Sequence, residues 1–262
     1  MKISVLGAGN MSSAIVKALS KTYDDIHIYD KETSAARHLK RAAAGNVKVA
    51  ADYDELLLDA DFFIIAVKPA VCRSLLSSFA GKVKGVAVSI AAGITTDTLG
   101  SYLGEIPIIR VMPNINAQIG ESVSAICRND RVSDADFEKA KTIFSQIGSI
   151  NELDEKFFPI FSTLASCSPA FTYLYIDSLA RAAQKLGMSK RESINIAAKA
   201  VAGSAKMLLY TDRHPHDMID SVCSPAGTTI EGLCKLSELG FENAVVRAFE
   251  ACVNKDKSIG DN

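Results

Sequence analysis

Six short apolar runs, separated by segments with helical spacing, recur through the first 153 residues of the chain. Apolar runs that alternate with helices predict parallel strands, with helices covering both faces of the sheet. Two further strands are expected at Ser122–Cys127 and Ser149–Leu153, with a helix over Ser133–Ile147 between them. The six runs lie at Ile3–Leu6, Ile26–Tyr29, Val47–Ala50, Phe62–Val67, Val86–Ile90 and Ile108–Met112.

After about Asp154 no strand-like run remains, and the spacing becomes helical. Proline suits the first turn of a helix and glycine the position after its end, which predicts one long helix between Pro169 and Gly187. The remaining helices are expected from Ser189 towards Leu209, over Thr228–Leu239 and over Glu242–Val253. We therefore expect an α/β domain over residues 1–153 and an all-helical domain over residues 154–262.

Charge and composition argue against several classes of function. The formal net charge of −1 leaves no basic field for nucleic acid or an anionic membrane. The longest apolar run, Phe62–Val67, is far shorter than the roughly 20 residues that span a bilayer, and no leader peptide is expected after Met1. The six cysteines lack zinc-like spacing, so no metal site is predicted. We expect a cytoplasmic protein with reduced thiols.

A glycine-rich turn follows the first predicted strand and opens a helical segment. Gly7 permits a tight turn, and Gly9 lets the backbone approach a pyrophosphate at the helix N-terminus. A bare Gly-x-Gly is a weak signal, and the alternative is a merely structural turn. The strand–turn–helix context favours a Rossmann-type dinucleotide site and hence a doubly wound sheet. The predicted cofactor-binding residues here are Leu6, Gly7, Ala8, Gly9, Asn10 and Met11.

Asp30 ends the second predicted strand, where an acidic residue bonds the adenosine ribose 2′-hydroxyl. Its carboxylate would repel a 2′-phosphate, which favours NADH over NADPH. Lys31 opposes this preference because it could contact a 2′-phosphate. An equally good interpretation of Asp30 is an N-cap for the following helix, since aspartate is a favoured cap.

Later strand ends belong to the same edge of the sheet, where such folds bind their ligands. Their small residues suit the close approach of a cofactor, although each segment could also be an ordinary strand-to-helix loop. The predicted cofactor-binding residues at these ends are Ala66, Val67, Lys68, Pro69, Ala91, Ala92, Gly93 and Asn114.

Together with these motifs, Arg110–Asn114, His214-Pro215 and Val222–Thr229 resemble the pyrroline-5-carboxylate reductase family. The resemblance implies NADPH- or NADH-dependent reduction of the cyclic imine 1-pyrroline-5-carboxylate to L-proline, the last step of proline biosynthesis. It also implies a helical domain that forms homodimers or larger homo-oligomers. The resemblance assigns substrate binding to Ser224, Gly227, Thr228, Thr229 and Cys167, with Ser224 and Thr229 also catalytic and Thr229 bonding the imine nitrogen.

The chain departs from the family pattern at three places near the implied substrate site. Ala165–Phe171 replaces Ser-Gly-Ser-Gly-Pro-Ala-Tyr, Pro225-Ala226-Gly227 replaces Pro-Gly-Gly, and Ile115-Asn116 replaces Thr-Pro. The hydroxyls of the 224–229 loop suit a carboxylate ahead of a helix N-terminus. Taken without the resemblance, the same loop could be a capped turn with no ligand.

Two alternative functions remain open from the sequence. A β-hydroxyacid-type dehydrogenase would need a lysine base on the first long helix after the sheet, and Ala170–Leu186 offers Lys185 only at its end. A non-catalytic, nucleotide-sensing relative could retain the fold without turnover. The altered segment around Cys167 and Ser168 supports this second alternative.

Overall fold

The computed structural model describes the backbone of residues 1–260 and the side chains of residues 1–256. It contains two compact units. The first comprises Met1–Ser166 together with the end of the chain from Val253, and the second comprises Cys167–Cys252. Among the described residues no helix is long and apolar enough to cross a membrane.

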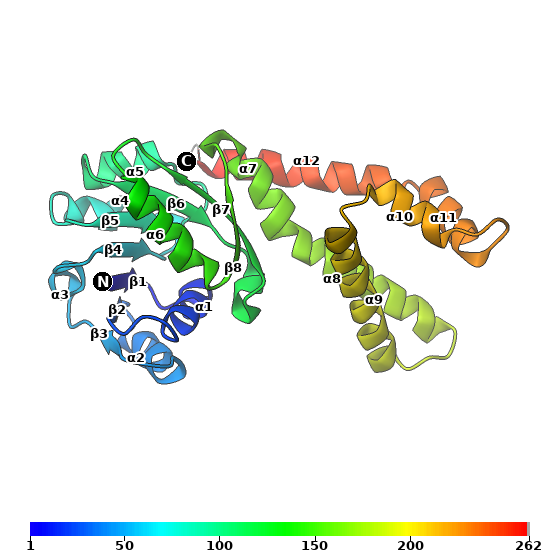
Figure 1. Cartoon of the computed structure of the whole chain (residues 1–262), viewed down its shortest axis with the longest axis horizontal. Helices are drawn as coiled ribbons and strands as arrows, with labels where there is room; N and C mark the ends of the chain where they lie inside the picture. Colours follow the sequence, from blue (N-terminus) through cyan, green and yellow to red (C-terminus); the bar gives the residue numbers. More distant parts are fainter. Residues whose placement is uncertain (261–262) are drawn as a thin grey trace. The chain divides into compact units, whose positions relative to one another are not determined.

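The first unit is built on one sheet of eight strands in the order β3-β2-β1-β4-β5-β6-β7-β8 (Figure 1). All neighbouring strands are parallel except β6 and β7, which are antiparallel. The predicted strands and the mostly parallel, Rossmann-type sheet are confirmed. The strands are β1 (Ile3–Leu6), β2 (Ile26–Tyr29), β3 (Val47–Val49), β4 (Phe62–Ile65), β5 (Val86–Ser89), β6 (Ile108–Met112), β7 (Ser122–Arg128) and β8 (Gly148–Glu152).

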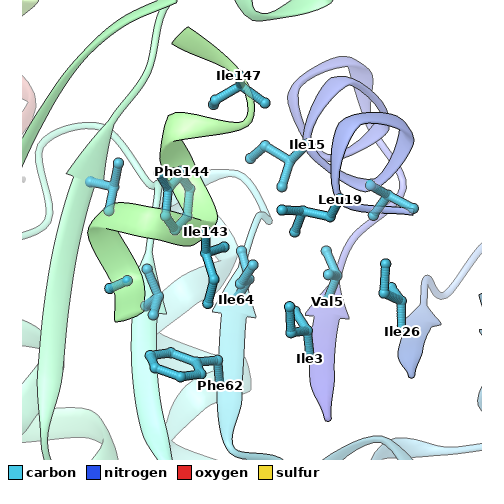
Figure 2. Close-up of a cluster of buried hydrophobic side chains, with 14 of the residues drawn as sticks. Ile3, Val5, Ile15, Leu19, Ile26, Phe62, Ile64, Ile143, Phe144 and Ile147 are labelled. Carbon is cyan, nitrogen blue, oxygen red and sulfur yellow. The ribbon is translucent and has the colours of Figure 1, made fainter. Parts of the chain in front are cut away.

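Helices cover both faces of this sheet because its central strands β1, β4 and β5 are buried on both sides. One face packs under α1 (Asn10–Leu19), α2 (Thr33–Ala42) and α6 (Asp134–Ser145). Figure 2 shows Ile15 and Leu19 of α1 and Ile143 of α6 over the strands on that face. The other face packs under α3 (Tyr53–Leu57), α4 (Pro69–Leu76), η1 (Ser77–Phe79) and α5 (Thr96–Leu103).

The first unit extends beyond residue 153, where we expected the domain boundary. Phe158, Phe161 and Ala165 pack against Met112 and other residues of β6 and β7. Buried Arg110 also forms an ion pair with Glu155, at 2.9 Å between Nη1 and Oε1. The segments involved are η3 (Glu155–Phe157), α7 (Phe158–Phe161) and the π-helix η4 (Ser162–Cys167); η2 (Ile115–Ile119) completes the unit.

The second unit is helical, as predicted. Ser189 caps α9 by accepting a hydrogen bond from the Glu192 amide at 3.4 Å, and Gly187 follows α8 with a φ of +102°. The short helix α10 was not predicted; His214 caps its start and Pro215 occupies its first position. The helices are α8 (Ser168–Lys185), α9 (Lys190–Thr211), α10 (Pro215–Val222), α11 (Thr228–Glu238) and α12 (Phe241–Gly260), whose end belongs to the first unit.

Candidate functional site

The glycine turn between β1 and α1 has the geometry of a dinucleotide loop. Gly7 has a φ of +109°, and a Cβ there would lie 2.7 Å from the Ala66 carbonyl oxygen at the end of β4. Gly9 precedes α1 as its N-cap, and a Cβ there would meet nothing within 4 Å. Gly7 therefore lets β1 and β4 approach, while Gly9 leaves open space before the free amides of the helix N-terminus. That combination fits a pyrophosphate.

The Asp30 carboxylate stabilises this turn through hydrogen bonds to the backbone. Its Oδ2 accepts a hydrogen bond from the Ala8 amide at 2.7 Å, and its Oδ1 accepts one from the Glu32 amide at 2.9 Å. The N-cap residue of α2 is Glu32, so Asp30 is not the cap itself. A carboxylate can accept about four hydrogen bonds, which leaves acceptor positions for a ribose hydroxyl.

A cavity of about 460 Å³ opens beside the glycine turn and Asp30. Three residues that the sequence analysis missed form an apolar wall: Tyr53, Val71 and Leu75. Burial, and then the neighbouring Tyr29, raise the pKa of Tyr53, so its ring stays neutral. Such a wall suits a purine base. The predicted residues that line the cavity are Leu6, Gly7, Gly9, Asp30, Lys31, Ala66, Val67 and Lys68.

Part of this wall could have been found from the sequence. Val71 and Leu75 lie four residues apart on α4, so they share one face of that helix. Tyr53 has no such signal, because only the fold brings α3 next to the end of β2. Its ring centroid lies 4.5 Å from that of Tyr29 and 5.0 Å from that of Phe79.

Several predicted cofactor residues lie outside this cavity. Ala8 and Asn10 instead line a larger, open hollow of about 880 Å³ over α1, α2 and η2. The smaller cavity is the candidate nucleotide site, because it is bordered by both turn glycines and by Asp30. The predicted residues outside both hollows are Met11, Pro69, Ala91, Ala92, Gly93 and Asn114.

Asn114 is buried, with 3% of its surface exposed. Its Nδ2 donates to the Ala165 carbonyl at 2.8 Å, and its Oδ1 accepts from the Val123 amide at 3.4 Å. Its backbone amide donates to the Ser122 hydroxyl at 3.1 Å. Most of its hydrogen-bonding capacity is therefore used within the protein.

In the second unit, the predicted substrate loop ends at the N-terminus of α11. The Gly227 amide donates to the Ser224 carbonyl at 3.0 Å, which closes the turn. Thr228 and Thr229 begin the helix, where the first amides have no partner within it. Their hydroxyls and amides can hold a carboxylate. Cys167 lies at the end of η4, immediately before α8.

Among the described residues, no three histidine, cysteine, aspartate or glutamate side chains lie close enough together to hold a metal ion. Burial raises the pKa of Cys127 to about 12 and that of Cys72 to about 11, so these thiols stay protonated at neutral pH. Both belong to the core of the sheet.

Two family models match the chain. The model for pyrroline-5-carboxylate reductase dimerisation matches residues 155–259. The model for NADP oxidoreductase, coenzyme F420-dependent, matches residues 2–93, which contain the glycine turn and Asp30.

Similar proteins cover nearly the whole chain. The pyrroline-5-carboxylate reductase of Methanosarcina acetivorans is 35% identical over 95% of this chain and 96% of its own. The pyrroline-5-carboxylate reductase of Aquifex aeolicus is 33% identical over 99% of this chain and 97% of its own. The solved 1-pyrroline-5-carboxylate reductase of Streptococcus pyogenes has a TM-score of 0.91 at 35% identity, covering 98% of both chains.

Two further solved structures bear on the cofactor and on the alternative dehydrogenase. Plasmodium falciparum pyrroline carboxylate reductase with NADP bound has a TM-score of 0.88 at 28% identity, covering 99% of this chain and 98% of its own. The 3-hydroxyisobutyrate dehydrogenase of Mycobacterium tuberculosis has a TM-score of 0.53 at 15% identity, covering 72% of this chain and 66% of its own. This similarity concerns the fold alone. The chain belongs to the pyrroline-5-carboxylate reductase family.

Proposed function

We propose that the protein reduces 1-pyrroline-5-carboxylate to L-proline with a hydride from NADPH or NADH. The observation that carries this proposal is the full-length similarity to pyrroline-5-carboxylate reductases, at 33% and 35% identity, in a chain whose glycine turn borders a nucleotide-sized cavity. The NADP bound by the Plasmodium falciparum relative supports the same cofactor class.

The first unit holds the dinucleotide. Gly9 and the first amides of α1 receive the pyrophosphate, and Asp30 accepts a hydrogen bond from the adenosine ribose. Tyr53, Val71 and Leu75 pack against the adenine. The reduced nicotinamide supplies the hydride when it is bound.

The 224–229 loop binds the imino acid. Ser224 and the first amides of α11 hold the carboxylate, where the helix dipole adds to the attraction. The Thr229 hydroxyl donates to the nitrogen of the neutral imine, and this hydrogen bond makes the imine carbon more electrophilic. Hydride adds to that carbon while the nitrogen takes up a proton from solvent, so the reaction requires positioning more than a strong acid. Cys167 is assigned to the same substrate by family resemblance.

The helical unit is the dimerisation unit. Within its described residues only Ala180, Ser193 and Ala197 are buried, so the unit has little core of its own. Large apolar side chains stand exposed on it, including Leu209 at 85% and Tyr210 at 88%. Exposed apolar surface of this extent marks an interface, and the match to a dimerisation model supports a second copy as its partner.

We assign cofactor binding to residues 1–153 of the first unit, and dimerisation and substrate binding to the part of residues 154–262 that forms the second unit, Cys167–Cys252. The proposed location is the cytoplasm, since all six cysteines are free thiols. The formal net charge of −1 gives no reason to expect nucleic acid or membrane as a partner.

The alternative β-hydroxyacid dehydrogenase has little support. Its chemistry needs a lysine base in the first helix after the sheet, and α8 carries Lys185 only as its last residue. The fold-level likeness to 3-hydroxyisobutyrate dehydrogenase adds nothing about the reaction. The nucleotide-sensing alternative differs from the reductase only in turnover.

The experiment follows the absorbance of NADPH or NADH in the presence of 1-pyrroline-5-carboxylate and purified protein. We expect cofactor oxidation that depends on the imine, and none with 3-hydroxyisobutyrate and NAD⁺ in the reverse assay. Cofactor binding without imine-dependent oxidation would favour the sensor. Oxidation of the hydroxyacid would favour the dehydrogenase.

A further inference from the structure

A carboxylate from the segment after the sheet holds the start of α5. Glu155, in η3, accepts two hydrogen bonds from Thr96, the first residue of α5. The Thr96 amide donates to Oε1 at 2.9 Å, and the Thr96 hydroxyl donates to Oε2 at 2.7 Å. The two residues are 59 positions apart in the sequence, and both belong to the first unit. The start of α5 is therefore fixed to a distant segment of its own unit.

The helix α5 also has a local cap, which is separate from Glu155. Thr95 is its N-cap residue, and the Thr95 hydroxyl accepts from the Thr98 amide at 3.1 Å. A local cap of this kind is sufficient to begin a helix. The bonds from Glu155 therefore add something other than capping, because they set where the helix begins relative to η3.

Buried Arg110 holds the Glu155 carboxylate in turn. Its Nη1 donates to Oε1 at 2.9 Å, and its guanidinium carbon lies 4.5 Å from the centre of the Phe158 ring. Arg110 is 3% exposed and lies on β6, opposite Ser89 of β5. Hydrogen bonds between charged groups are stronger than those between neutral groups, and more so away from water. The sheet thus fixes Glu155 through Arg110, and Glu155 fixes Thr96.

Residues 90–95 form the loop between β5 and α5, whose far end is held in this way. At its near end, the Ala91 amide donates to the Ser89 hydroxyl at 3.2 Å. Between the two ends, Gly93 has a φ of +74°, which glycine adopts without strain. The course of the loop is therefore set from both ends, by β5 and by the contact of Thr96.

This loop lies where the nicotinamide half of a dinucleotide is expected. The strands β1 to β6 are parallel, so their carboxyl ends share one edge of the sheet. The glycine turn follows β1, and Asp30 follows β2 on one side of it. The strands β4 and β5 lie on the other side of β1. A dinucleotide with its pyrophosphate at the turn and its adenosine ribose at Asp30 extends its other half towards β4 and β5.

We propose that Thr96 and Glu155 are positioning residues for the nicotinamide half of the cofactor. Their bonds, held by Arg110, set the course of the 90–95 loop and thereby the surface on which the nicotinamide lies. The adenosine half is bound elsewhere, at Asp30 and the wall that contains Tyr53. This inference rests on the cofactor site of the proposed function, and it concerns residues that do not themselves touch the cofactor.

The test compares the binding of NADPH with that of its adenosine half, adenosine 2′,5′-bisphosphate, by calorimetric titration. Thr96→Val removes the hydroxyl bond to Glu155, keeps the shape of the side chain and leaves the ion pair with Arg110 intact. We expect the NADPH Kd to rise about tenfold and the bisphosphate Kd to change less than about twofold, because only one half of the cofactor meets the loop. The kcat for the imine should fall by about 10–10²-fold, because hydride transfer depends on the position of the nicotinamide.

Two matched variants separate positioning from stability. Thr96→Ser keeps the hydroxyl and should bind both ligands as the wild type does. Ser133→Ala removes the side-chain cap of α6 in the same unit. It should lower the Tm through the lost cap and leave the ratio of the two Kd values unchanged.

Parallel weakening of NADPH and of the bisphosphate by Thr96→Val would overturn the inference, and so would unchanged NADPH binding. Glu155→Gln should show the same selective loss, and adding Thr96→Val to it should cost less than about threefold more, because both act through one contact. Full additivity would contradict this. If Glu155→Gln does not fold, Thr96→Val decides alone. Imine-dependent oxidation by the wild type is measured first: its absence refutes the proposed function, while the ratio of the two Kd values still tests the positioning.

Discussion

At the scale of single residues, the two turn glycines have separable tasks. Alanine at Gly7 would bring a Cβ within 2.7 Å of a backbone oxygen in a left-handed conformation, whereas alanine at Gly9 meets open space at a φ of −76°. We expect Gly7→Ala to lower the unfolding free energy by about 1–3 kcal/mol. Gly9→Ala should keep the Tm of the wild type and weaken NADPH binding, because its methyl group occupies the space for the pyrophosphate.

Thermal denaturation and a fluorescence titration with NADPH on the same two variants check this prediction. An unchanged Tm in Gly7→Ala would contradict the close approach of β1 and β4. Tight NADPH binding by Gly9→Ala would move the pyrophosphate away from this turn.

We expect the choice between NADH and NADPH to depend on the residues around Asp30. The sequence favours NADH because a carboxylate repels a 2′-phosphate, and this preference stays a prediction. The structure weakens this argument for NADH. Both carboxylate oxygens of Asp30 accept hydrogen bonds from backbone amides, and Lys31 and Lys68 line the same cavity. We expect Lys31→Ala to weaken NADPH binding about tenfold and NADH binding less than about twofold, because a charge-assisted bond to phosphate is worth about 1.5–3 kcal/mol.

Calorimetric titration with each cofactor measures the two affinities. Lys40→Ala, which removes the same charge from the last turn of α2, is the control. Equal weakening of both cofactors by Lys31→Ala would mean that Lys31 does not meet the 2′-phosphate.

At the scale of elements, the strands were predictable because buried parallel strands are continuous apolar runs. The glycine turn was predictable because its chemistry is local. The apolar wall at Tyr53 and the bond from Asn114 to Ala165 were not, because each depends on segments that only the fold brings together. The π-helix also escaped prediction, because Pro169 indicated a helix start and gave no sign of a helical segment before it.

Our proposal for substrate binding rests on the N-terminus of α11. Replacing Thr229 by valine removes the hydroxyl and keeps the shape, so a bond that strengthens as hydride arrives is lost. We expect Thr229→Val to lower kcat on the order of 10²-fold and Ser224→Ala mainly to raise the imine KM. Steady-state kinetics separate the two effects, and NADPH affinity should stay unchanged. Wild-type kcat/KM in both variants would remove this loop from the active site.

The same loop contains a strained residue. Ala226 has a φ of +57° where the family pattern has glycine. A left-handed alanine costs roughly 1–2 kcal/mol, and glycine at this position would relieve that strain. Glycine also gives the unfolded chain more conformational freedom, which offsets part of the stabilisation. We expect Ala226→Gly to raise the Tm slightly, by thermal denaturation. A clear fall in Tm would show that the Ala226 methyl group makes contacts worth more than the strain.

At the scale of the whole molecule, the two units differ in how much they bury. The first has two large core clusters, on opposite faces of its sheet. The second leaves side chains such as Leu174, Leu209 and Tyr210 exposed, and its described residues include almost no buried positions. A helical unit with so little core depends on a partner for its stability, because the free energy of folding comes mainly from buried apolar surface.

That difference predicts that folding and dimerisation are coupled. We expect a dimer at micromolar concentration by sedimentation, and a Tm that rises with protein concentration, because association stabilises by mass action. Leu209→Asp places a charge on the exposed apolar surface of α9 and should lower the Tm and favour the monomer. Leu58→Asp is the matched control, since Leu58 is 61% exposed but lies in the first unit, after α3. A stable, active monomer whose Tm does not depend on concentration would refute the coupling, because the second unit would then fold without the surface that a partner covers.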